Sequence, residues 1–389
     1  MYARSLVLPT RSFFLFGPRG TGKTTWLRAA LNGQPSRWFD LLLDTELVRL
    51  TRDPRVFTQE VEALPAGTWV VIDEVQRLPG LLNHVQDLVT RHGQRRYRFA
   101  LTGSSARKLK RGGANLLPGR VVNRLFFPLT SAELDDEFRI ETALRFGSLP
   151  AIWADATNDR ERIELLDAYV QNYLTQEVRA EAVVKELGPF SRFLDVAALA
   201  NGQVTNVSSL ARDAGVARPT VQGYFEVLID TLLGFWLPAW QPRSRVKEVR
   251  HPKFYFFDTG IVRAITGRLR DSPNELERGV LLETYVLHEL RAAMNHHGSG
   301  GQLSYWRTPS GSEVDFVWTR GKSSVGIEVK SGSRWRLQDG AALKQLVQQG
   351  TVRRGVATYM GNARLRDGPL DVLPIAEFLQ RLNAAEILD

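Results

Sequence analysis

The sequence predicts an α/β protein with more than one domain, and three observations support this prediction. The chain has 389 residues, which is more than one ordinary hydrophobic core accommodates. Between residues 12 and 130, short unbroken apolar runs alternate with helical stretches, as in a parallel sheet covered on both faces. Near residue 275 a helix precedes a second series of strands. The expected division is a parallel-sheet core at 1–130, a helical lid at 131–190, a winged helix at 191–274 and a second α/β domain at 275–389.

The composition excludes several kinds of chemistry and favours one kind of partner. Cysteine is absent, which excludes disulfides, thiolate zinc sites and cysteine nucleophiles. The chain has 51 basic and 42 acidic residues, a formal charge of +9, and arginine supplies most of the basic residues. The rigid fork of arginine suits phosphate, which favours DNA as a partner. An arginine-rich genome explains the same excess equally well, so the charge alone is weak support for DNA.

No membrane or export segment is expected. No apolar run approaches the roughly 18 residues that a membrane helix needs. The apolar stretch near the N-terminus is short, lies between Arg4 and Arg11, and has no small-residue cleavage site. We therefore expect a soluble, cytoplasmic protein.

A phosphate-binding motif lies near the N-terminus. Residues 17–24 fit the pattern G-x-x-x-x-G-K-[ST], follow a strand expected at 13–16 and open a helix expected at 24–31. Such a P-loop turns its backbone N–H groups toward phosphate oxygens, Lys23 neutralises the β and γ phosphates, and Thr24 offers a hydroxyl to magnesium. The alternative is an ordinary strand-to-helix turn. The predicted nucleotide ligands are Gly17, Pro18, Arg19, Gly20, Thr21, Gly22, Lys23, Thr24 and Thr25.

Hydrolysis also requires a carboxylate at the end of a neighbouring buried strand. The run 69–72 is followed by Asp73, which we expect to hold magnesium through water, and by Glu74, which we expect to polarise the attacking water. The alternative is that the two acids only cap the following helix. A further strand at 99–102 ends in Thr102, which is placed to sense the γ-phosphate.

Two adjacent acids and a polar strand end resemble the AAA superfamily of P-loop ATPases, over roughly residues 5–190. The resemblance implies ATP and Mg²⁺ as cofactors and a homo-oligomeric ring, with a hexamer favoured. It also implies that a neighbouring subunit donates an arginine to each ATP. Arg120 is the candidate and Arg124 the next, although a surface arginine in a basic segment is the alternative. No second sensor arginine is identified in the lid.

The middle of the chain has a helix-turn-helix pattern. Residues 208–216 and 217–225 have the spacing of two helices joined by a short turn. The second helix is expected to present Arg218, Thr220 and Gln222 to DNA. A following hairpin would carry a basic tip, which suits contact with phosphate. The alternative is a packing module between domains. The basic residues at the tip are Arg243, Arg245, Lys247 and Arg250.

Near the C-terminus, acidic residues fall on two expected strands. The interval between Asp315 and Glu328 suits a hairpin, and alternation puts Glu328 and Lys330 on one face. Two carboxylates and a lysine converging there could hold magnesium and steady a water attacking a phosphodiester, with Glu283 on the preceding helix as a further ligand. A solvated hairpin face is the alternative.

These residues resemble the PD-(D/E)XK core of restriction-endonuclease-like proteins. The resemblance implies a metal site at Glu283, Asp315 and Glu328, with Lys330 as a catalytic residue. The whole arrangement resembles a family of bacterial and archaeal AAA ATPases with a C-terminal region of uncharacterised function. The expected function is an ATP-hydrolysing, DNA-binding protein that remodels, translocates on or processes DNA. Two alternatives stay open, a nucleotide-controlled switch or defence effector with a triggered nuclease, and an interaction platform with an inactive nuclease fold.

Overall fold

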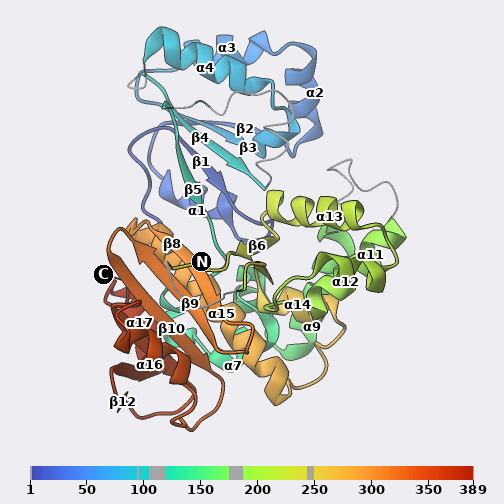
Figure 1. The fold of residues 1–389 in the computed structure, drawn as a ribbon. Coiled ribbons are helices and arrows are strands. Elements are labelled where there is room, and N and C mark those ends of the chain that lie inside the picture. The colour runs from blue at the N-terminus through green and yellow to red at the C-terminus, as the bar shows by residue number, and fades with distance from the viewer. Residues whose placement is uncertain are drawn as a thin grey trace. The chain divides into compact units, whose positions relative to one another are not determined.

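A computed structural model describes residues 2–93, 96–104, 117, 119–174, 187–242 and 249–388. The chain forms two compact units (Figure 1). One unit holds residues 4–128 together with 230–233, and the other holds 129–229 and 234–389 with the first three residues. Within the described ranges, no helix combines the length and apolar character that crossing a bilayer would require.

The first unit is built on a five-stranded parallel sheet with the order β2-β3-β4-β1-β5. This confirms the predicted α/β class. One expectation was wrong, because β4 lies between the P-loop strand β1 and the acid-bearing strand β3, which therefore do not pair. The strands are β1 (Phe13–Phe16), β2 (Ser36–Asp40), β3 (Trp69–Asp73), β4 (Arg98–Gly103) and β5 (Val122–Leu125).

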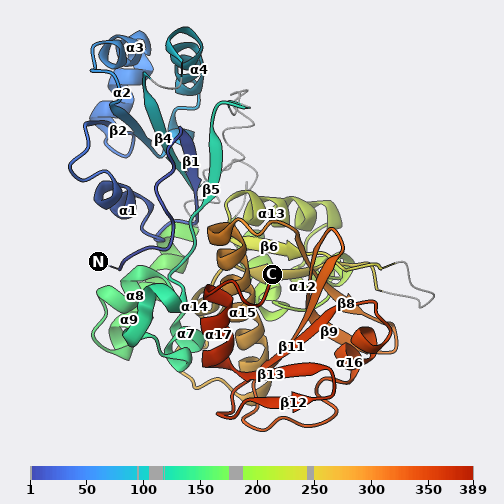
Figure 2. The same cartoon turned by 90° about the vertical axis from the view of Figure 1, so that its left-hand side faces the viewer.

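Both faces of this sheet are buried, which explains the unbroken apolar runs. On β1, Phe13 and Leu15 pack on the face that holds Trp26 of α1, whereas Phe14 and Phe16 pack on the opposite face. Both views show α1 on one side of the sheet and α2, α3 and α4 on the other (Figures 1 and 2). The helices are α1 (Lys23–Ala30), α2 (Asp44–Arg52), α3 (Arg55–Glu62) and α4 (Leu81–His92), with a 3₁₀ turn at Val75–Arg77.

The second unit begins with short helices where a helical lid was expected. They are α6 (Ser131–Leu134), a 3₁₀ turn at Asp135–Glu137, α7 (Ile140–Phe146), α8 (Pro150–Ala154), α9 (Asp159–Ala168) and a π-helical turn at Tyr169–Leu174. Next come α11 (Leu187–Leu199), α12 (Val207–Ala214), α13 (Arg218–Asp230), the antiparallel pair β6 (Gly234–Leu237) and β7 (Lys253–Phe256), and α14 (Thr259–Ile265). The boundaries at 130, 190 and 274 stay predictions.

A six-stranded mixed sheet dominates the rest of this unit, in the order β12-β13-β11-β10-β9-β8 (Figure 2). Its strands β9 and β10 form the predicted antiparallel hairpin. Helices α15 and α17 pack on one face, and α16 packs on the other. The elements are α15 (Glu275–His297), β8 (Gln302–Arg307), β9 (Glu313–Arg320), β10 (Ser323–Lys330), α16 (Ala341–Gln348), β11 (Arg354–Tyr359), β12 (Leu365–Asp367), β13 (Leu370–Pro374) and α17 (Ile375–Asn383).

A buried carboxyl group ties α15 to the start of α6. One oxygen of Glu289 accepts hydrogen bonds from the backbone N–H of Ser131 (2.6 Å) and from the Tyr285 hydroxyl (2.5 Å). The other oxygen is buried and has no hydrogen-bond partner in the described part of the chain. Burial raises the pKa of Glu289 to about 7, although these hydrogen bonds oppose the shift. Burial therefore favours the protonated form of this carboxyl.

We expect Glu289→Gln to stabilise the protein at pH 8 and to change little at pH 5. The folded state raises the pKa of this carboxyl above its usual value, so wild-type stability falls as pH rises from about 4.5 to 7, and glutamine removes that dependence. The gain at pH 8 should be at most about 3 kcal/mol. Urea unfolding followed by circular dichroism at both pH values measures it.

The exposed Glu275, in the first turn of the same helix, provides the control. Glu275→Gln should change the free energy of unfolding by less than about 1 kcal/mol at either pH. A Glu289→Gln variant that is less stable than wild type at pH 8 would contradict the prediction.

Candidate functional site

The P-loop forms a tight turn that only glycine fits well. Gly20 and Gly22 have φ values of 80° and 88°, in the left-handed region that residues with a Cβ rarely adopt. A Cβ on Gly17 would lie 2.3 Å from the carbonyl oxygen of Phe126, which follows β5. The glycine positions of the motif therefore have a steric cause in the backbone itself.

The turn leaves the N-terminus of α1 without a side-chain cap. Gly22 is the cap residue, and no acidic side chain lies in the first helical turn. Lys23 is buried, and its Nζ donates hydrogen bonds to the carbonyl oxygens of Gly17 (2.8 Å) and Pro18 (3.1 Å). An uncapped helix start beside an ammonium group is favourable for phosphate.

Asp73 lies next to the hydroxyl of the P-loop threonine. The Thr24 hydroxyl donates a hydrogen bond to Asp73 Oδ2 at 2.8 Å, and the Thr102 hydroxyl donates to Oδ1. Burial raises the pKa of Asp73, while the hydrogen bonds from Thr102 and Thr24 oppose the shift. A buried carboxylate gains from a nearby cation, so Thr24 and Asp73 together suit magnesium.

Thr102 joins the two acids. Besides donating to Asp73, its hydroxyl accepts a hydrogen bond from the backbone N–H of Glu74 at 2.9 Å, and the residue is fully buried. Through these two hydrogen bonds, Thr102 orients the side chain of Asp73 and the backbone of Glu74. Its predicted part in sensing a γ-phosphate stays a prediction.

Glu74 adopts an unusual backbone conformation and has two polar neighbours. Its φ of 58° is uncommon for a residue with a side chain, and such positions concentrate at functional sites. One carboxylate oxygen accepts hydrogen bonds from Gln76 Nε2 and from the Ser104 hydroxyl (3.4 Å). Gln76 Nε2 also donates to Ser104 Oγ at 2.9 Å. Sequence reasoning missed Gln76, whose only signal is its place two residues after Glu74.

Arg4 is a second residue that the sequence did not reveal. Its guanidinium donates hydrogen bonds to the carbonyl oxygens of Thr21 (2.9 Å) and Phe127 (2.6 Å) and lies 4.1 Å from the centre of the Phe126 ring. It thereby connects the P-loop to the segment after β5. An isolated arginine before the first strand carries no motif, so no pattern could have identified it.

For the remaining residues predicted at this site, the structure shows how exposed each one is. Arg19 is partly exposed and Thr25 is exposed on α1. Arg120 and Arg124 are half-buried near β5, and the backbone N–H of Arg120 donates to Leu117 O at 3.0 Å. The basic residues Arg107, Lys108, Lys110 and Arg111 lie outside the described residues. The role of Arg120 stays a prediction.

The helix-turn-helix pattern corresponds to α12, a left-handed Gly215 (φ 65°) and α13. Asn206 caps α12 by accepting hydrogen bonds from the N–H groups of Ser208 (3.1 Å) and Ser209 (3.2 Å). An aromatic core joins α11 and α13 to the strands β6 and β7. It consists of Phe190, Phe193, Tyr224, Phe225, Trp236 and Phe254.

The outer face of this helix pair carries polar side chains. Arg212, Arg218 and Gln222 are exposed, and Thr220 is half-buried. Arg250 after the hairpin tip is exposed, whereas Arg243, Arg245 and Lys247 lie outside the described residues. The exposed side chains suit contact with a phosphate backbone or a groove.

The C-terminal acids occupy the hairpin β9–β10. Asp315 Oδ2 accepts a hydrogen bond from the backbone N–H of Val329 at 2.8 Å, and Lys330 pairs with one oxygen of Glu328. The other oxygen of Glu328 is buried and has no hydrogen-bond partner among the described residues. Burial raises the pKa of Glu328 well above its usual value.

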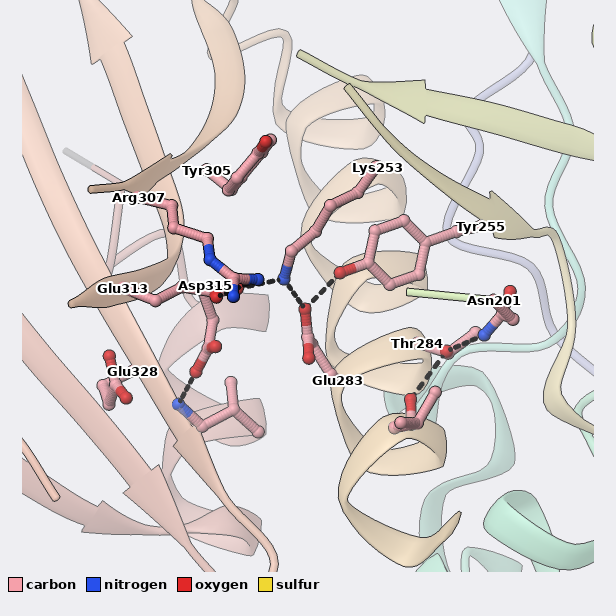
Figure 3. Close-up of polar contacts among 12 residues, drawn as sticks. Asn201, Lys253, Tyr255, Glu283, Thr284, Tyr305, Arg307, Glu313, Asp315 and Glu328 are labelled. Atoms are coloured by element: carbon pink, nitrogen blue, oxygen red, sulfur yellow. Dashed lines mark hydrogen bonds and ion pairs between the residues drawn. The ribbon is translucent and has the colours of Figure 1, made fainter. Parts of the chain in front are cut away.

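Glu283 contacts a lysine that the sequence reasoning did not include. Lys253 Nζ lies 2.8 Å from Glu283 Oε1 and also pairs with Glu313, while the Tyr255 hydroxyl donates to the same Glu283 oxygen (Figure 3). Burial acts to lower the pKa of Lys253, but the charges of Glu283, Glu313 and Asp315 outweigh it and raise the pKa. Across the described ranges, no three His, Asp or Glu side chains are arranged to hold a metal ion. The predicted metal role of Glu283, Asp315 and Glu328 stays a prediction.

Three family models match parts of the chain. Residues 9–134 match an AAA domain, and residues 137–272 and 278–378 each match a domain of unknown function. The first part of the chain is therefore similar to an AAA domain, the type of domain that the motif predicted. The matches to the other two segments confirm neither a winged helix nor a nuclease-like domain.

Relatives and solved structures extend the comparison. Uncharacterised proteins of Mycobacterium tuberculosis and Mycobacterium bovis are each 29% identical over 323 residues, covering 82% of this chain and 70% of the relative. Among structures, the RuvB Holliday junction branch migration motor of Thermotoga maritima is 17% identical, with a TM-score of 0.31, and covers 60% of this chain and 83% of that one. The Orc1 protein of Aeropyrum pernix in complex with DNA is 14% identical, with a TM-score of 0.28, and covers 67% and 87%.

We expect Gly17→Ala to destabilise the first unit and weaken nucleotide binding. The added Cβ would lie 2.3 Å from a backbone oxygen, which cannot move aside as a flexible side chain would. The cost should be about 1–3 kcal/mol in the urea unfolding of the chain. Gly80→Ala is the matched control, because Gly80 has φ −57° and nothing within 4 Å of its added Cβ. Equal stability of the two variants would contradict the steric account.

Proposed function

We propose that this chain hydrolyses ATP with magnesium and uses the cycle to act on DNA. The observation that supports the first part best is the 2.8 Å hydrogen bond between Thr24 and Asp73, under an uncapped helix start. A hydroxyl and a carboxylate at that distance suit the coordination of one magnesium ion, which would neutralise phosphate charge there. Lys23 would exchange its two backbone carbonyl partners for phosphate oxygens, which are stronger acceptors.

Glu74 is the proposed group that orients and polarises the attacking water. Its carboxylate is held by Gln76 and Ser104, and its backbone N–H is held by Thr102. This fixes the position of the group before nucleotide arrives, which lowers the cost of reaching a reactive arrangement. In this proposal Arg120 acts on the ATP of a neighbouring subunit in a homo-oligomeric ring, a hexamer in the favoured form.

The DNA part of the proposal rests on α12 and α13. Two helices joined at a left-handed glycine expose Arg212, Arg218 and Gln222, and the chain carries a charge of +9. Arginine and amide side chains of this kind contact phosphates and base edges in DNA. The C-terminal acids resemble nuclease residues, and this resemblance would add DNA cleavage to the function. The contacts of Lys253 and Tyr255 with Glu283 do not favour metal-dependent cleavage.

We expect Lys23→Ala and Glu74→Gln to separate nucleotide binding from hydrolysis. Lys23→Ala removes the ammonium that faces phosphate, so binding of a fluorescent ATP analogue should fall by at least about tenfold. Glu74→Gln leaves binding nearly intact but should lower phosphate release by about 10²–10⁴-fold, because the amide cannot polarise water. Glu62→Gln, at a partly exposed position on α3, serves as the control and should change neither quantity. Wild-type turnover in both site variants would overturn the ATPase proposal.

We expect an Arg212→Ala/Arg218→Ala variant to bind DNA more weakly and with a smaller salt dependence. Removing two phosphate contacts should lower the slope of log affinity against log salt by about 2. Fluorescence anisotropy with duplex, single-stranded and branched DNA measures both effects. The control is Arg55→Ala/Arg160→Ala, which removes the same charge from exposed positions elsewhere.

An equal effect of the two double variants would assign DNA binding to net charge and contradict a role for α13. Phosphate release measured with the same DNA panel distinguishes the remaining functions. Strong stimulation by DNA supports a motor, slow unstimulated turnover with triggered cutting supports a switch or defence effector, and no response supports an interaction platform.

A further inference from the structure

Four carboxylates from three elements meet in the second unit. Glu283 comes from α15, Glu313 and Asp315 from β9, and Glu328 from β10. Figure 3 shows Lys253 of β7 reaching from the opposite side into the space between Glu283 and β9. The resemblance to a nuclease implies that a divalent metal ion binds in this space.

The lysine is part of the fold and not a loose surface chain. Lys253 is 2% exposed, and its strand pairs with β6 through Leu237. Its Nζ lies 2.8 Å from Glu283 Oε1, forms an ion pair with Glu313 and lies 5.2 Å from the centre of the Tyr305 ring. Carboxylates on α15 and β9 hold the ammonium, and the Tyr305 ring on β8 adds a favourable cation–π contact.

The carboxylates are also engaged in ways that disfavour a metal. The Tyr255 hydroxyl donates to the Glu283 oxygen that Lys253 contacts. Asp315 accepts the Val329 N–H, and Arg307 pairs with Glu313 at 3.2 Å. Magnesium demands near-octahedral oxygen ligands at about 2.0–2.1 Å, and an ammonium bound to the same oxygens would repel it.

A neighbouring pocket has the same mixed charge. Its volume is about 590 Å³, and Lys253, Glu283, Arg307 and Glu313 line it. Two cations thus face the pocket beside two carboxylates. The two positive and two negative charges balance, so the pocket does not attract a further cation.

We propose that Lys253 is the resident cation of this acidic cluster, occupying the place where a nuclease would bind a divalent metal ion. The ammonium pairs with Glu283 and Glu313, Arg307 supplies a second positive charge beside Glu313, and Lys253 thereby joins β7 to α15 and β9. The C-terminal domain then keeps nuclease-like residues without metal-dependent cutting. This inference is independent of the ATPase proposal.

Manganese binding to the full-length chain without nucleotide tests the proposal. Free Mn²⁺ is followed by electron paramagnetic resonance for wild type, Glu283→Gln, Lys253→Arg, Lys253→Met and Lys253→Met/Glu283→Gln. We expect wild type, Glu283→Gln and Lys253→Arg to bind the same amount of Mn²⁺. Lys253→Met should gain one additional Mn²⁺ per chain, because the cluster loses its cation, and the added Glu283→Gln change should abolish that gain.

Two outcomes would overturn the inference. One is Mn²⁺ binding by wild type that Glu283→Gln removes, and the other is a folded Lys253→Met chain that gains no site. Where Lys253→Met fails to fold by circular dichroism, the comparison of wild type with Glu283→Gln still decides. DNA cleavage by wild type with Mn²⁺ that Asp315→Asn abolishes would likewise overturn it.

Discussion

The hydrogen bond between Thr24 and Asp73 connects the two parts of the first unit on which its proposed chemistry depends. It joins the glycine turn after β1 to the end of β3, although β4 lies between those strands. Thr102, at the end of β4, fills the interval and bonds both to Asp73 and to the backbone of Glu74. The order of the strands therefore decides which side chains meet, and the carboxyl ends of parallel strands bring them to one edge.

The two acidic clusters of the chain differ in how their charge is compensated. Hydroxyl groups surround Asp73, and hydroxyl groups provide hydrogen bonds without adding positive charge. An ammonium group contacts Glu283, which supplies a full positive charge. A buried carboxylate of the first kind still gains from an incoming cation, whereas one of the second kind gains much less. Residue type alone does not distinguish these cases, because both clusters contain acidic residues on strand ends.

Local patterns predicted what depends on neighbours in the sequence. The P-loop, the acids at the end of β3, the hairpin β9–β10 and the helix pair α12–α13 each lie within a short window, and their elements are present. Most of what was missed depends on distant parts of the chain. Strand β5 has few apolar residues and is recognised only through its pairing with β1. Lys253 precedes Glu283 by thirty positions and Glu313 by sixty, so no local pattern links them.

The contact of Arg4 with the P-loop gives the residues before β1 a part in the candidate nucleotide site. Its guanidinium donates hydrogen bonds to the carbonyl of Thr21, within the glycine-rich turn, and to that of Phe127, which follows β5. Removing the residues before β1, or fusing a bulky affinity tag to them, would disturb the hydrogen bonds of Arg4 while leaving the whole motif intact. Purified protein prepared in that way would have a correct motif and a loosened loop.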